Sequence, residues 1–121
     1  MTLNNPVFIY ELPYPPSINR YWRSVSGRVL ISKEGREYRE KVNKSIDAKG
    51  LLLSGRLIVK IAAYMPDKRR RDLDNLNKAL LDSMTHAGVW IDDSQIDELK
   101  ITRCADNKGG RVIVSVMEVK Q

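Results

Sequence analysis

Residues 56–88 read RLIVKIAAYMPDKRRRDLDNLNKALLDSMTHAG, and this stretch decides the fold. In its first part, residues alternate between the two faces of an extended chain with a period of two, which predicts a strand that ends near Met65-Pro66. The apolar residues on one side of that strand are Leu57, Val59, Ile61 and Ala63. After a basic run, one stripe of a predicted helix that ends at Gly88 carries Leu73, Leu76, Leu80 and Met84. A strand followed by an amphipathic helix predicts a helix packed on a sheet.

The N-terminal side extends this pattern. Residues 7–12 form an apolar run, which predicts a strand, and the prolines that follow predict an extended loop. Gly27 offers a turn before a second short strand at residues 28–31. A further helix is predicted to begin with Ser32 as its N-cap and to end at Gly50. Its apolar residues recur every four positions and are Tyr38, Val42 and Ile46.

The C-terminal third completes the predicted fold. Leu99 and Ile101 indicate a strand that turns at residues 107–110 into a returning strand, so we expect a hairpin there. The returning strand carries Val112, Val114 and Val116. The predicted class is therefore α+β, with one domain over residues 1–121 and two main helices packed on a mixed or antiparallel sheet.

Composition narrows the class of protein. Lys and Arg number 21 against 15 Asp and Glu, so the net charge of +6 favours an acidic partner such as nucleic acid. Cys104 is the only cysteine, which excludes an intrachain disulfide and predicts a partly buried strand residue in a reducing compartment. No apolar run approaches the roughly 20 residues of a membrane helix, and residues 1–6 lack a secretion-signal pattern. We expect a cytoplasmic protein without a membrane partner.

The chemistry is suggested by acidic residues next to a basic run. Asp72 and Asp74 directly follow the run at residues 68–71, and Asp92-Asp93 come shortly after the helix. Carboxylates placed close together repel one another unless a cation lies between them, whereas guanidinium groups suit a polyanionic backbone. Asp74 and Lys78 lie about 40° apart on one flank of a helix, one turn from each other. Asp72 can point to the same side as Asp74 only if its backbone is not helical, so we place it at the junction of strand and helix.

These residues suit Mg²⁺, which prefers oxygen ligands and is commonly held by a few carboxylates and substrate phosphates. Asp72, Asp74 and one of Asp92 or Asp93 would hold it, while Lys78 would contact the phosphate or the attacking water. The structural alternative is that the aspartates cap helices or complement a helix dipole, that Lys78 forms a surface ion pair, and that the basic run is a solvated turn.

Three further side chains have mainly structural interpretations. His86 is expected to complement the dipole at a helix C-terminus. Trp90 is expected to lie in the core. Trp22, among arginines, is equally compatible with packing and with stacking on a base.

Several motifs together resemble the RusA family of Holliday-junction resolvases. The main ones are residues 65–78 and 88–93, and the others are residues 12–19 with Tyr21, residues 32–39 and residues 108–111. The resemblance covers nearly the whole chain in the correct order. It implies a homodimeric, Mg²⁺-dependent endonuclease, with Mn²⁺ able to substitute, that introduces paired nicks in four-way DNA junctions during recombination and repair. Such enzymes are often carried by phages and prophages.

The resemblance also assigns roles to individual residues. Asp72, Asp74 and Asp93 match the family's metal-binding carboxylates and Lys78 matches its catalytic lysine, so Asp92 becomes a neighbour of the site. The residues expected to bind DNA are Lys68, Arg69, Arg70, Arg71 and Asn75. Two other classes stay open, namely a junction-binding protein without catalysis and a metal-dependent nuclease that cuts flaps, forks or RNA.

Overall fold

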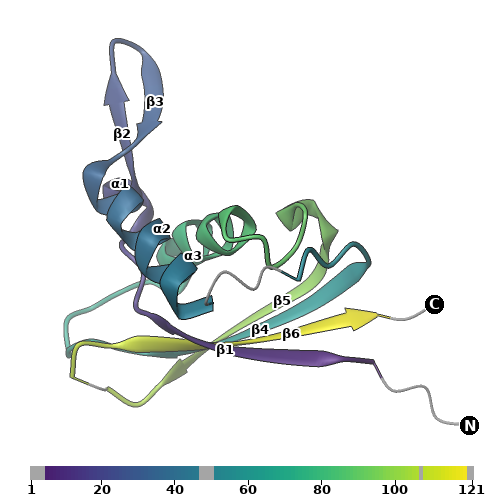
Figure 1. Cartoon of the computed structure of the whole chain (residues 1–121). Coiled ribbons are helices and arrows are strands. Elements are labelled where there is room, and N and C mark those ends of the chain that lie inside the picture. Colours follow the sequence, from purple (N-terminus) through teal and green to yellow (C-terminus); the bar gives the residue numbers. More distant parts are fainter. Residues whose placement is uncertain (1–4, 47–50, 107, 120–121) are drawn as a thin grey trace, which may run out of the picture.

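The computed structural model describes residues 5–46, 51–106 and 108–119 as a mixed α+β fold (Figure 1). In chain order the elements are β1 (Val7–Pro13), α1 (Ile18–Tyr21), β2 (Trp22–Val25), β3 (Arg28–Ile31), α2 (Lys33–Ile46), β4 (Arg56–Tyr64), α3 (Asp74–His86), η1 (Asp93–Gln95), β5 (Ile96–Cys104) and β6 (Arg111–Val119). Four strands form one sheet in the order β1-β6-β4-β5. Helices α2 and α3 lie over one face of this sheet (Figure 1). The predicted fold class is confirmed.

The core lies between these helices and the sheet. The alternation predicted for β4 is confirmed, because Leu57, Val59, Ile61 and Ala63 are all at most 1% exposed. From β6, the buried side chains are Val112, Val114 and Val116. The helices cover them with Tyr38, Val42 and Ile46 of α2 and Leu76, Leu80 and Met84 of α3. The core interpretation of Trp90 is also confirmed, since this residue is fully buried and its Nε1 donates a hydrogen bond to Thr85 Oγ1 over 2.6 Å.

The predicted C-terminal hairpin is wrong. β5 and β6 do not pair with each other, because β5 lies parallel to β4 on one side while β6 lies antiparallel to β4 on the other. Helix α3 supplies the crossover that a parallel β4–β5 pair needs. The β5–β6 connection therefore passes the end of β4, where a Cβ on Gly110 would meet Pro66 Cβ at 2.9 Å. Asn107 of the predicted turn lies outside the described residues.

The ends of the two main helices follow local signals. Ser32 caps α2 as predicted, with its Oγ accepting a hydrogen bond from the Gly35 N–H over 2.9 Å. Gly88 follows α3 with φ +82°, a left-handed conformation that ends the helix. His86 is exposed in the last turn of α3, at the helix terminus where we expected it. Gly50, the predicted end of α2, lies outside the described residues.

A two-stranded arm projects from the fold beside α1 (Figure 1). β2 and β3 pair antiparallel, and the turn between them has positive φ at Ser26 and Gly27, as tight hairpins require. This confirms the predicted turn and short strand at residues 28–31, whereas part of the predicted loop before them forms α1. The Trp22 ring contacts the ring of buried Tyr21 edge-on, with centroids 5.0 Å apart, which supports packing.

Two further expectations concern the single cysteine and membrane-spanning helices. Cys104 is partly buried at the end of β5, which agrees with a strand position. Among the residues described, no helix combines the length and the apolar character that crossing a membrane would require.

Candidate active site

The candidate site begins where β4 ends and α3 starts. Residues 65–73 connect the two elements, and Asp72 lies in this connection while Asp74 is the first residue of α3. The Asn75 N–H donates to the Asp72 carbonyl over 3.2 Å as the chain enters the helix. Lys78 follows Asp74 by one turn on the same flank of α3. The predicted placement of Asp72 outside the helix is confirmed.

Asp72 and Asp74 do not cap a helix, and Lys78 does not form a surface ion pair with a described residue. The N-cap position of α3 is Leu73, and no side chain caps this helix. Asp72, Asp74 and Lys78 are exposed, and no hydrogen bond or ion pair within the described chain engages either of these two carboxylates. These two carboxylates therefore have no direct partner in the described fold, and only Asp74 lies in the first turn of α3, where the helix dipole favours a negative charge.

Asp92 and Asp93 have different environments. Asp92 caps η1, because its carboxylate accepts the Ser94 N–H over 3.0 Å and its own N–H donates to Gln95 Oε1 over 2.8 Å. Hydrogen bonds from Ser94, and to a smaller extent the positive charge of Lys78, lower the pKa of Asp92. The charge of Lys78 on α3 therefore reaches the turn that carries Asp93. Asp93 itself is half-buried as the first residue of η1, with no described side chain bonded to its carboxylate.

Gln95 holds this turn in place and was not singled out by the sequence. Its amide nitrogen donates to the carbonyls of Leu53 and Gly55 over 2.8 and 2.9 Å, and its amide oxygen also accepts the Ile91 N–H over 2.9 Å. With only 9% of its surface exposed, Gln95 ties the residues before β4 to those before β5. The position of Asp93 therefore depends on a buried amide two residues away.

The three predicted ligands do not form a compact cluster. Within the described ranges, no three acidic, His or Cys side chains lie close enough together to hold a metal ion. Repulsion between like charges keeps such carboxylates apart when no cation lies between them. Their chemistry nevertheless fits Mg²⁺, which takes oxygen donors and needs only one or two carboxylates when phosphate oxygens complete its shell. A shared ion would have to bring the three carboxylates closer together.

The basic run is an ordered turn built around Asp67. The carboxylate of Asp67 accepts the Arg69 N–H over 2.9 Å and forms an ion pair with both terminal guanidinium nitrogens of Arg71, one of them over 3.1 Å. Hydrogen bonds from Arg71 and then from Arg69 hold the pKa of Asp67 far below its ordinary value. The interpretation of the run as a freely solvated turn is therefore wrong for Arg71. Lys68 and Arg70 are exposed, and their side chains bond to nothing else in the described chain.

Comparison with known proteins now identifies the family. The family model described as endodeoxyribonuclease RusA matches residues 13–117. The chain belongs to the RusA family. It is 45% identical over 112 residues to the crossover junction endodeoxyribonuclease of Enterobacteria phage 82, with 89% of this chain and 92% of that protein covered. The protein of the same name from Escherichia coli K12 is 44% identical over 110 residues with the same coverage, and that of Enterobacteria phage HK97 is 42% identical over 113 residues. The predicted resemblance is confirmed.

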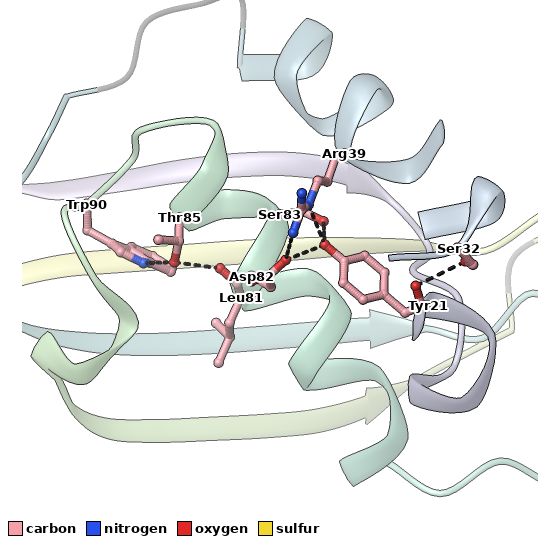
Figure 2. Close-up of polar contacts among 8 residues, drawn as sticks. All are labelled: Tyr21, Ser32, Arg39, Leu81, Asp82, Ser83, Thr85 and Trp90. Carbon is pink, nitrogen blue, oxygen red and sulfur yellow. Dashed lines mark hydrogen bonds and ion pairs between the residues drawn. The ribbon is translucent and has the colours of Figure 1, made fainter. Parts of the chain in front are cut away.

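This RusA-family chain also contains a polar network that the sequence did not predict (Figure 2). Arg39 of α2 donates to Asp82 Oδ2 over 2.7 Å and to the Tyr21 hydroxyl over 2.9 Å, and that hydroxyl donates to the same carboxylate. Burial alone would raise the pKa of Asp82, but the hydrogen bonds from Tyr21 and Arg39 outweigh it and lower the pKa. The network joins α1, α2 and α3.

Proposed function

We propose that the chain is a Mg²⁺-dependent endodeoxyribonuclease that resolves four-way DNA junctions by paired, symmetric nicks. Membership of the RusA family supports this, as do relatives named crossover junction endodeoxyribonucleases. The observation that carries the proposal is the exposed pair Asp72 and Asp74, whose carboxylates form no hydrogen bond or ion pair with the described residues, at the end of a cationic turn. An inert DNA-binding protein would gain nothing from negative charges placed against its anionic partner.

The chemistry is hydrolysis of a phosphodiester. Water attacks phosphorus and one ester P–O bond breaks, leaving a terminal phosphate on one side and a free hydroxyl on the other. Asp72, Asp74 and Asp93 would hold Mg²⁺, or Mn²⁺ in its place, which lowers the pKa of the attacking water and offsets the charge that develops on the phosphate. Lys78, exposed one turn beyond Asp74, donates hydrogen bonds to a phosphate oxygen as charge accumulates there.

The cationic turn binds the DNA backbone next to this site. Lys68 and Arg70 project freely and contact phosphates directly. Arg69 and Arg71 keep the turn in shape through Asp67 and add to its positive field. Asn75, exposed in the first turn of α3, lies beside Asp74 and contacts the same strand. Selectivity for a junction comes from the branched shape, because phosphate contacts alone carry no sequence information.

We further propose that the protein acts as a homodimer. A four-way junction has approximate two-fold symmetry, and a two-fold dimer presents two equivalent sites to symmetry-related phosphates. The sheet face opposite the helices supports this proposal, because it presents exposed apolar residues on its edge strand. Ile9 is 70% exposed and Val7 is 47% exposed, and both point away from the buried Leu12 side of β1.

The test is cleavage of a synthetic four-way junction beside a linear duplex, a flap and a fork of equal arm sequence. Each is incubated with Mg²⁺ or with EDTA, using the wild type and Asp74→Asn. We expect symmetric nicks in the junction alone, dependent on both Mg²⁺ and Asp74. Preferential cutting of the flap or fork would assign the protein to another nuclease activity, and binding without cutting would leave a DNA-binding protein.

A further inference from the structure

A groove runs from the candidate active site toward α2. Beside the site, a hollow of about 380 Å³ is lined by Asp72 and Asn75 together with Arg70 and Arg71. A larger hollow of about 470 Å³ continues from it along α1 and α2. The residues lining both hollows are Tyr14, Pro15, Ser17, Arg70 and Arg71. Because these five residues line both, the two hollows adjoin each other, and together we call them the groove, with Asp72 at one end.

The far part of the groove carries an excess of positive charge from separate segments of the chain. Five cationic side chains and two carboxylates line it. Arg20 comes from α1 and Lys41 from α2, and the others belong to the cationic turn. The carboxylates are Glu34 and Glu37. Positive charge gathered from three segments along one channel suits an extended polyanion better than a single phosphate.

The two carboxylates are weakly held and leave the cations available. Arg20 and Glu34 are 4.0 Å apart with side chains 73% and 50% exposed, so this ion pair is weak and Arg20 can turn to a phosphate at little cost. Glu37 pairs at 3.9 Å with Lys33, a residue that does not line the groove. The side chain of Lys41 has no hydrogen bond or ion pair within the described chain.

The floor of the groove is less polar. Pro15 is buried, and the ring of Tyr14 lies beneath the guanidinium of Arg71, with the guanidinium carbon 6.0 Å from the ring centroid. The Tyr14 hydroxyl donates to Met65 Sδ over 3.4 Å, which holds the ring in place from the other end. In a DNA strand, less polar sugars alternate with charged phosphates. A partly apolar floor would suit the sugars, and the cationic side chains beside it would suit the phosphates.

We propose that this groove binds the sugar–phosphate backbone of the strand that continues from the scissile phosphate. Arg20 and Lys41 contact phosphates beyond the cut, and Tyr14 with Pro15 supports a deoxyribose between them. The inference rests on the proposed function and deepens it. It assigns DNA contacts to α1 and α2, far along the chain from the cationic turn.

The experiment compares two lysines of α2 that lie one turn apart. Lys41 lines the groove, whereas Lys44 does not line it and lies 3.7 Å from Glu40. Affinity for a four-way junction is measured in EDTA over a series of salt concentrations for Lys41→Gln and Lys44→Gln. We expect Lys41→Gln to weaken binding and to reduce the slope of log K against log salt by about 0.9, the value for one lost phosphate contact, while Lys44→Gln keeps the wild-type slope.

A second pair of variants removes negative charges, which should have the opposite effect on binding. Glu37 lines the groove, and Glu40 lines a different hollow. Glu37→Gln should tighten junction binding, and Glu40→Gln should leave it unchanged. Equal effects on junction binding within both pairs would overturn the proposal that the groove binds DNA. Binding would then depend only on general charge attraction. Failure of the proposed function is a separate result that is read from cleavage, because the wild-type protein would then not cut the junction selectively, whether or not it bound it. All four residues are exposed, so the variants should keep the wild-type melting temperature.

Discussion

At the scale of single residues, the sharpest test contrasts two adjacent aspartates. Asp93→Asn should abolish cleavage while leaving junction binding equal or tighter, because it removes a proposed ligand and a negative charge. Asp92→Asn should retain cleavage, since Asn is also a good N-cap and Asp92 serves to cap η1. Cleavage rates with enzyme in excess and thermal melting of both variants check this. A loss of cleavage for Asp92→Asn as large as that for Asp93→Asn would contradict the assignment.

The sequence could predict these residues only in part. Asp74 and Lys78 were placed on one flank of a helix because helical periodicity is local, and the structure agrees. Whether Asp72 and Asp74 were caps depended on which residue occupied the N-cap position, and that position proved to be Leu73. The role of Asp67 was missed although its partners lie two and four residues away, because charge spacing alone does not show which carboxylate a turn encloses.

At the scale of elements, the Tyr21–Arg39–Asp82 network should stabilise the packing of three helices. Asp82→Asn should lower the free energy of unfolding by about 1–3 kcal/mol, as expected when hydrogen bonds to a partly buried charge are lost. Asp97→Asn is the control, because Asp97 pairs with Arg56 in a more exposed setting, and it should cost less. Denaturant unfolding of the three proteins measures the difference, and equal destabilisation would reject a special role for the network.

The pH dependence of the same variants gives an independent measurement. The pKa of Asp82 is lowered in the folded protein, so its stabilising contribution is complete above the unfolded pKa of about 3.9. It is lost as the pH falls below that value toward the folded pKa, because the unfolded state then binds a proton that the folded state binds only weakly. Wild type should therefore lose more stability than Asp82→Asn between about pH 5 and pH 3. Parallel curves would contradict the assigned contacts.

The positions of helices and strands were predicted better than the pairing of the strands. Strands and helices follow from periodicities of two and of about 3.6 residues, which are local properties of the chain. Pairing is not local: the nearest sequence neighbour of β6 is β5, yet β6 pairs with β4 and β1. The turn at Gly109 and Gly110 looks the same in sequence whether it joins neighbouring strands or passes over a third one. Long-range contacts such as Arg39 to Asp82 lie beyond sequence periodicity for the same reason.

At the scale of the whole molecule, the proposed dimer can be tested by placing a charge on the open sheet face. Ile9→Glu should shift the protein toward monomer, because a two-fold interface would bury two unpaired carboxylates. Val29→Glu is the matched control, since Val29 on the β3 arm is 69% exposed against 70% for Ile9. The mass in solution, measured by sedimentation or light scattering, separates the two variants.

The dimer also predicts how the cuts are linked. Two nicks made within one complex require two sites on the same junction, so an Ile9→Glu monomer should release singly nicked junctions where the wild type releases resolved products. A junction held in a supercoiled cruciform distinguishes these outcomes, because one nick relaxes the plasmid and two symmetric nicks linearise it. Linear product from a monomeric Ile9→Glu protein would show that coupling does not need this face. A fully dimeric Ile9→Glu protein would place the interface on another surface.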